Sequence, residues 1–146
     1  MPPISPPPYT PQQLKKALID AGFEVFRTRG EEIVLAERPR ENLIMDSGVR
    51  LRVAAPLEVR IVMRAQKADY PNEDEAHLFD RVRAAAAPVL ARGFAEQAAV
   101  ASKVTDPGDA ERTLDTFYEI TYAKAEADMD QALETLRFAM GLEKRA

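Results

Sequence analysis

Apolar and polar residues alternate through residues 57–66, Leu-Glu-Val-Arg-Ile-Val-Met-Arg-Ala-Gln. The apolar set on one side is Leu57, Val59, Ile61, Met63 and Ala65. Because successive side chains of a strand point to opposite faces, this spacing predicts a half-buried strand. We therefore expect a sheet with one covered face and one wet, mostly polar face.

Helix signals occur in three places. Thr10, Pro11 and Gln13 form a capping box with proline at the first helical position, and Gly22 supplies a stop. A second helix is expected to open at Pro71-Asn72, to bend or end at Pro88 and to stop at Gly93. A last amphipathic helix is expected over about residues 126–142, with acidic residues leading it and basic residues closing it.

Strand signals fill the stretches between these helices. Residues 23–28 and 32–37 flank a short glycine-containing connection, and Pro39 is expected to end the second of them. Residues 94–104 have the alanine content of a helix but alternate like a strand, and a turn cluster at 105–109 separates them from a second alternating run. Because that second run needs an antiparallel partner, we predict a strand for 94–104.

Residues 40–56 leave two interpretations open. Leu43, Ile44 and Met45 fit either a helical turn or part of a strand, and Asp46-Ser47-Gly48 has turn composition. The resulting fold class is α+β. We expect an antiparallel sheet of about five strands packed on one side by three helices, in the order α-β-β-β-α-β-β-α.

Residues 10–146 are predicted to form one domain, and residues 1–9 a disordered proline-rich tail. Pro3-Ile4-Ser5-Pro6 also fits the minimal pattern that docks into aromatic grooves. The tail has no basic region followed by an apolar region, so we expect no secretory signal. There is no apolar run of about 18 residues that would cross a membrane. These features favour a cytoplasmic location.

Composition narrows the chemistry. The chain has no cysteine, which excludes disulfides, thiol nucleophiles and thiolate metal sites. Residues 22–67 hold nine basic and seven acidic side chains, and residues 68–146 hold nine and sixteen, within a net charge of −4. This balance argues against nucleic-acid binding, which depends on phosphate neutralisation, but it allows a local basic patch in the first half. No glycine-rich phosphate loop occurs, and no cofactor is predicted.

Candidate catalytic and metal residues are few. His77, the single histidine, has Asp74 and Asp80 three residues away on either side. This spacing allows a small metal or acid–base site, or an exposed histidine beside carboxylates that cap a helix, and we favour the second. Ser47 lies in a turn sequence rather than a nucleophile elbow. Tyr118 and Tyr122 share a strand face, as core residues or as the wall of a pocket.

Arginines form the most informative polar group. Arg50, Arg52, Arg60 and Arg64 alternate with apolar residues, so they share one face if their strands belong to one sheet, with Arg27 or Arg29 nearby. Such a face can dock an acidic protein segment or a phosphate-bearing ligand. The ordinary alternative, which we favour, is a solvated face crossed by carboxylates such as Glu58 and Glu119.

The order of elements (14–21, 23–66, 72–90, 94–122 and 126–142) resembles that of class I type III secretion chaperones and their broader bacterial relatives. This resemblance implies a homodimer that binds segments of partner proteins and has no catalytic residues. It also implies a dimer contact on the second helix, where Ala84–Ala87 would permit close approach.

From these observations we expect a non-enzymatic protein-binding module, chaperone-like or adaptor-like. Arg50, Arg52, Arg60 and Arg64 would steer acidic groups of the partner. The alternative is a small-molecule-binding domain or enzyme with a pocket between sheet and helices, where carboxylates, tyrosines and His77 would act.

Overall fold

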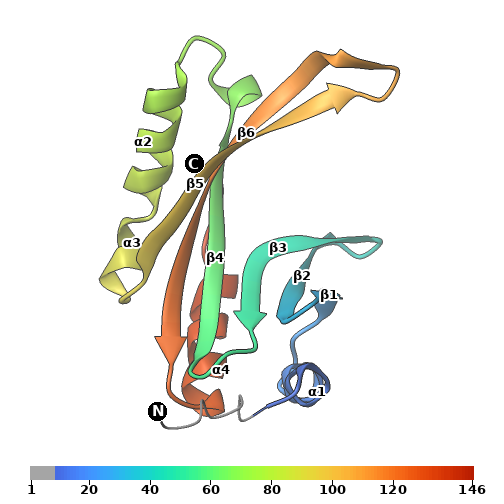
Figure 1. Ribbon diagram of the computed structural model, residues 1–146, viewed down its shortest axis with the longest axis vertical. Helices are drawn as coiled ribbons and strands as arrows, with labels where there is room; N and C mark the ends of the chain where they lie inside the picture. The colour runs from blue at the N-terminus through green and yellow to red at the C-terminus, as the bar shows by residue number, and fades with distance from the viewer. Residues whose placement is uncertain (1–8) are drawn as a thin grey trace, which may run out of the picture. The chain divides into compact units, whose positions relative to one another are not determined.

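The protein is α+β, with one antiparallel sheet in the strand order β1-β2-β3-β4-β6-β5 (Figure 1). The computed structural model describes residues 9–146, and residues 1–8 of the predicted proline-rich tail, including Pro3–Pro6, lie outside them. Within the described part, the chain forms two compact units. The first holds the chain up to Ile61 together with Lys124–Leu142, and the second holds Val62–Ala123 and Glu143–Ala146. One domain over residues 10–146 stays a prediction.

The first unit is built on four antiparallel strands. They are β1 (Val25–Arg29), β2 (Glu32–Arg40), β3 (Leu43–Arg52) and the first half of β4 (Leu57–Gln66). Their register sets one fully buried row across three strands, Ile33, Leu51 and Val59. The burial pattern of β4 alternates along its whole length, so the predicted half-buried strand is confirmed.

Two helices pack against this part of the sheet. α1 (Pro11–Asp20) lies against β1 and β2, and α4 (Met129–Met140) lies against β3. The predicted capping box of α1 is present: Gln13 N–H donates to Thr10 Oγ1 at 3.2 Å, and Thr10 N–H donates to Gln13 Oε1 at 2.9 Å. Leu14 and Leu18 of α1 are fully buried.

The ambiguous stretch 40–56 is a strand through most of its length. The predicted turn at Asp46-Ser47-Gly48 is instead an irregularity inside β3, where Gly48 takes a φ of 80° and its N–H bonds Asp46 Oδ1. Pro39 does not end β2, which continues to Arg40. The register shifts between Glu37 and Arg40, and a proline, which has no N–H, is tolerated at such an irregular place.

The second unit combines the other half of β4 with two helices and a long hairpin. A 3-10 turn η1 (Lys67–Asp69) leads to α2 (Glu75–Ala85) and α3 (Ala87–Ala91), then to β5 (Ala95–Asp106) and β6 (Asp109–Glu126). Asp74 rather than Asn72 caps α2, so this helix begins later than predicted. The predicted break at Pro88 is confirmed, because α2 ends at Ala85 and the proline lies in the first turn of α3.

The strand prediction for 94–104 is confirmed by β5, which pairs with β6 along its whole length. Tyr118, Ile120 and Tyr122 of β6 are buried, and the Phe79 ring of α2 meets the Tyr118 ring edge-on at 5.3 Å. The described residues therefore hold six strands and four α-helices, where about five strands and three helices were predicted. The differences are β3, which the sequence left open, and the separate helix α3.

Candidate binding surfaces

The predicted arginine face exists in the first unit, and its register is regular. One row across the four strands is Arg27, Val34, Arg50 and Arg60, and the next is Arg29, Glu32, Arg52 and Glu58. Paired residues of antiparallel strands point to the same side, so these eight side chains share one face. Val34 is nevertheless buried, since it lies between arginine stems that can cover it.

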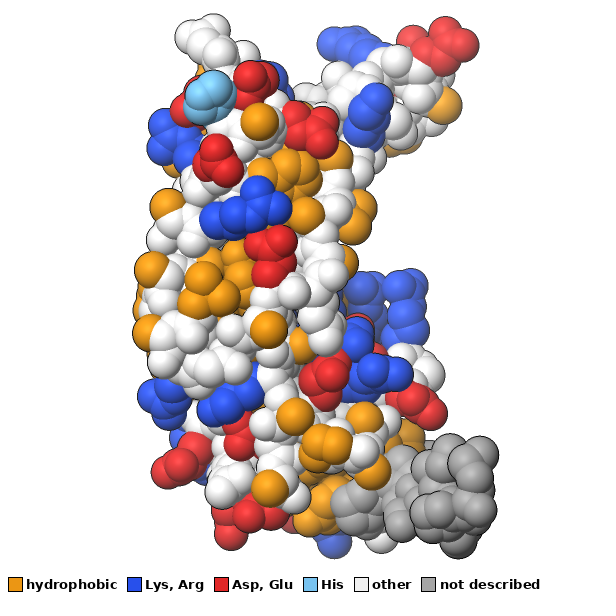
Figure 2. Space-filling view, turned by 60° about the vertical axis from the view of Figure 1, so that its left-hand side comes forward, with side chains coloured by type: hydrophobic (Ala, Val, Ile, Leu, Met, Phe, Trp, Pro, Cys, Tyr) orange, Lys and Arg blue, Asp and Glu red, His pale blue; other side chains and the backbone are white. Residues whose placement is uncertain are grey.

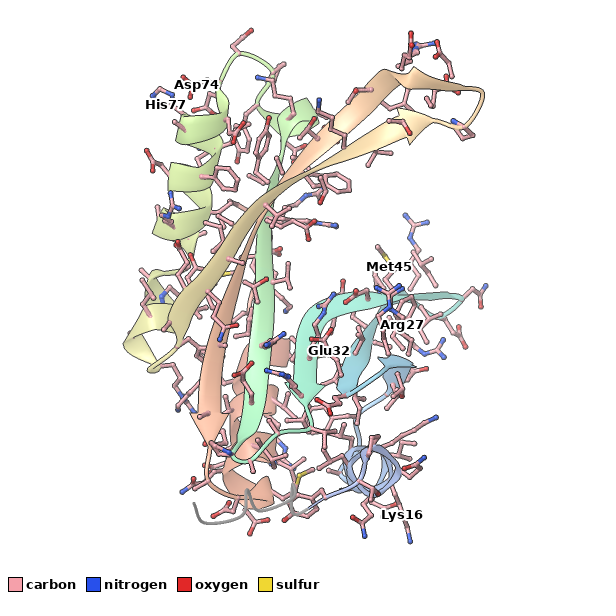
Figure 3. The ribbon with its side chains drawn as sticks, viewed as in Figure 1. Lys16, Arg27, Glu32, Met45, Asp74 and His77 are labelled. Carbon is pink, nitrogen blue, oxygen red and sulfur yellow. The ribbon has the colours of Figure 1, made fainter. Side chains whose placement is uncertain are left out.

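Three of the arginines on this face are bound by carboxylates of the same chain. Arg50 lies 2.9 Å from Asp46 and 3.3 Å from Glu32. Arg60 lies 3.4 Å from Glu32 and 2.5 Å from Glu58. Arg27 reaches Asp46 at 4.0 Å, and Figure 3 shows Arg27 and Glu32 on these strands.

This ion-pair network joins three arginines to three carboxylates, so its formal charge is zero. The side chain of Arg50 is only 16% exposed, and its Nη1 is buried without a hydrogen-bond partner. The network thus resembles the ordinary cross-strand pairing considered above more than a free basic patch. Its arginines are paired within the chain, so their charges are largely neutralised for an acidic partner.

The other two predicted arginines lie in different surroundings. Arg52 is half-buried on the arginine face, beside Glu32 and Glu58 in register, but no carboxylate of the described chain forms an ion pair with it. Arg64 belongs to the second unit, where its guanidinium lies 4.9 Å from the centroid of the Phe117 ring. The structure therefore brings Arg50, Arg52 and Arg60 together and gives Arg64 a separate contact.

A second exposed feature of the first unit was not singled out by sequence reasoning. Leu43, Ile44 and Met45 begin β3 next to the turn from β2, and they are 43%, 40% and 37% exposed. Successive strand residues face opposite sides, so this hairpin end is apolar on both faces. Figure 3 shows Met45 and Arg27 near it. A run of exposed apolar residues is unfavourable in water, so such a run is expected only where it serves a function.

His77 is an exposed histidine beside a helix cap, as favoured from the sequence. Asp74 caps α2 by accepting the His77 N–H at 2.9 Å, and its Oδ1 also lies 2.7 Å from His77 Nδ1. The bond between the ring and the carboxylate raises the pKa of His77. The pKa of Asp74 is lowered, first by the hydrogen bond from the His77 backbone N–H and then by the bond to the ring. Figure 2 shows the histidine at the surface among acidic side chains. Within residues 9–146, no group of three or more potential ligands is placed to hold a metal.

Ser47 and the tyrosines have structural roles. The Ser47 hydroxyl is buried, donates to the Leu35 carbonyl at 2.7 Å and accepts the Val49 N–H at 3.1 Å. Tyr118 and Tyr122 are core residues, and burial raises the pKa of Tyr122, with a further contribution from Glu96. The hydrogen bonds of Ser47 and the burial of the two tyrosines give these residues structural roles, and no catalytic function is needed to account for them.

One surface hollow of about 440 Å³ lies in the first unit between the α1–β1 connection, β2 and α4. It is lined by Gly22, Phe23, Glu24, Ala36, Glu37, Arg38, Arg137 and Met140. Arg38 donates from Nε and Nη2 to the two carboxylate oxygens of Glu24, at 2.7 and 2.5 Å, and these hydrogen bonds lower the pKa of Glu24. A carboxylate held in this way is a poor general base near neutral pH. Neither the tyrosines nor His77 line the hollow.

Comparisons with protein families, with curated proteins and with solved structures found no significant match. Every helix in the described chain is too short or too polar to span a membrane. The assignment of function therefore depends on the surfaces of the chain itself.

Proposed function

We propose that this chain is a non-enzymatic, cytoplasmic protein-binding module, chaperone-like or adaptor-like, that acts as a homodimer. The observation that carries the proposal is the exposed run Leu43-Ile44-Met45 at the β2–β3 hairpin end. Three adjacent large apolar side chains facing water are unfavourable in the free chain, and a partner that covered them would recover that free energy. The chaperone-type resemblance stays a prediction.

Charge in the first half of the chain supports a partner of stated chemistry. Residues 22–67 carry a net charge of +2 in a chain whose total is −4. Arg52 is the arginine of the predicted set that keeps no ion pair on this face. We therefore expect an extended segment with large apolar side chains at one end and acidic ones at the other. The apolar part would meet the hairpin end, and the acidic part would meet Arg52 at the other end of β3.

The experiment is a comparison of captured proteins between matched variants. The immobilised chain is exposed to native lysate, and retained proteins are quantified by mass spectrometry for the wild type, I44D and I19D. Ile19 is the control, because it is 52% exposed on α1 of the same unit and receives the same substitution. A partner of the hairpin end is retained by the wild type and I19D and lost with I44D. Equal retention by all three chains would remove this surface from the proposal.

The arginine contribution is tested with Arg52→Gln rather than with a change at Arg60. Arg60 binds Glu32 and Glu58, so its substitution would break the network and change folding together with binding. R52Q removes a charge that has no ion pair to lose, and it sets no new carboxylate opposite Glu32 and Glu58. We expect weaker capture and a smaller salt dependence for R52Q, with nearly unchanged unfolding.

The second candidate function, a small-molecule site, has one supporting observation, the hollow beside Arg38 and Arg137. Its two arginines would suit an anionic ligand. Because all three guanidinium nitrogens of Arg38 already donate hydrogen bonds, two to Glu24 and one to the Glu41 carbonyl, we place this candidate second.

A further inference from the structure

β5 is a long and open edge of the sheet. It stands last in the strand order and pairs with β6 on one side only. All twelve of its residues are exposed or half-exposed, and Val100 is 55% exposed. The outer side of such a strand presents backbone donors and acceptors that another strand can pair with.

The opposite edge of the sheet shows how an edge avoids pairing. β1 is five residues long and carries Arg27 and Arg29. Short length and charged side chains are common means by which natural edges avoid joining other strands. β5 is twelve residues long, and its central segment, Ala98–Ser102, holds neither a charge nor a proline. The central segment of this edge therefore lacks the protection that β1 has.

The register of β5 fits a second copy of the same strand. Pairing with β6 is regular from Ala98 to Val104 and shifts on either side of that segment. In a two-fold antiparallel pair within one sheet, opposed residues must lie on the same face. Pairing centred on Val100 satisfies this condition. Val100 then lies opposite Val100 of the other copy, and Ala98 lies opposite Ser102 of the other copy.

The charges of the strand fit the same register. Glu96 and Lys103 are the only charged residues between positions 95 and 105, and they lie on one face, since their β6 partners are Tyr122 and Thr116. Glu96 and Ala98 pair with adjacent residues of β6, so Gln97 is the extra residue of a bulge. With that bulge, pairing about Val100 sets Lys103 of one copy opposite Glu96 of the other.

Glu96 already forms an ion pair within the chain, and its surroundings leave room for a second cation. It lies 3.0 Å from Arg83, which also lies 3.7 Å from Asp80. The three side chains carry a formal charge of −1, and no carboxylate of the described chain forms an ion pair with Lys103. The two-fold contact therefore places Lys103 of each copy beside the acidic group around Glu96 of the other copy.

We propose that two copies of the chain pair through β5, antiparallel and centred on Val100, to form a continuous sheet. This inference rests on the homodimer of the proposed function and names its surface, in place of the second-helix contact that the chaperone resemblance implies. This register favours a second copy of the chain over a strand of another protein. In it, Val100 lies opposite Val100 of the other copy, and Lys103 lies opposite Glu96 of the other copy.

The test is the mass of the chain in solution, measured by sedimentation equilibrium over a dilution series. The wild type is expected at twice the 16.2 kDa of one chain. V100K and V100E are each expected as single chains, because like charges then face each other, and their equimolar mixture is expected to regain the dimer. L114K is the matched control, since Leu114 is 53% exposed on β6 and away from the free edge.

A second measurement covers the case in which V100K fails to fold, as judged by circular dichroism. The chain has no cysteine, so V100C carries a single thiol. Mild oxidation is expected to cross-link V100C into dimers and to leave L114C as single chains. A wild type of single-chain mass at every concentration overturns both the homodimer and this surface. A dimer that V100K leaves intact and V100C fails to cross-link overturns the surface alone, and partner capture by the β2–β3 hairpin end stays unaffected.

Discussion

Arg50 and Arg60 stand directly opposite each other on β3 and β4, and Glu32 lies within 3.4 Å of both guanidinium groups. Like charges directly opposite on a sheet are unfavourable. This pair is tolerated because a single carboxylate from β2 bridges it, with Asp46 and Glu58 at the two sides. Glu32 is therefore the residue on which the arginine face depends.

Substituting Glu32 by Gln should destabilise the protein by about 1–2 kcal/mol. The change leaves two partly buried arginines opposed without the shared charge, and hydrogen bonds to charged groups contribute about 1.5–3 kcal/mol. Urea unfolding measures the effect. E31Q is the control, since Glu31 is exposed and its side chain forms no ion pair within the described chain. If both variants unfold at the same urea concentration, the network does not stabilise the sheet.

Removing the hydroxyl of Tyr122 should stabilise the second unit slightly. Tyr122 is 1% exposed, and its hydroxyl is buried without a hydrogen-bond partner in the described chain. A buried unsatisfied polar group costs about 1–3 kcal/mol, so Y122F is expected to raise the free energy of unfolding by about 1 kcal/mol. Thermal unfolding checks this. A loss of stability in Y122F would show that the hydroxyl has a partner in solution.

His77 should titrate above its ordinary pKa, because its ring bonds the Asp74 carboxylate. The folded-state pKa is raised, so the contribution of this pair to stability is present below the unfolded pKa and is lost as pH rises through the folded one. NMR titration of the single histidine measures the shift. In D74N the cap is kept, since asparagine also caps helices, and the pKa of His77 should fall toward its ordinary value.

Local signals were enough to predict most elements. Thr10 with Gln13, the alternation of 57–66 and the turn at 105–109 all depend on neighbours in sequence, and each appears in the structure. The strand assignment of 94–104 needed one further argument, the partner required by the strand after the turn. The strand prediction for 94–104 was confirmed because pairing with β6 overrides the helix propensity of the alanines.

The remaining features depend on distant contacts. Residues 43–52 form a strand because β2 and β4 pair with it on both sides, which no local pattern encodes. The sequence predicted Arg50, Arg52 and Arg60 on one face but could not show that Glu32, 18 residues before Arg50, forms ion pairs with Arg50 and Arg60. The exposed hairpin end had one visible signal, three consecutive apolar residues between charged ones at 41 and 46.

The most direct measurement of the proposed function is the dissociation constant of the strongest captured protein for the wild type, I44D and I19D. Burying an Ile side chain contributes about 1.5–3 kcal/mol, and each 1.4 kcal/mol is about tenfold in affinity. We predict that I44D weakens binding by about tenfold or more while I19D binds like the wild type. Equal dissociation constants for the three chains would contradict it.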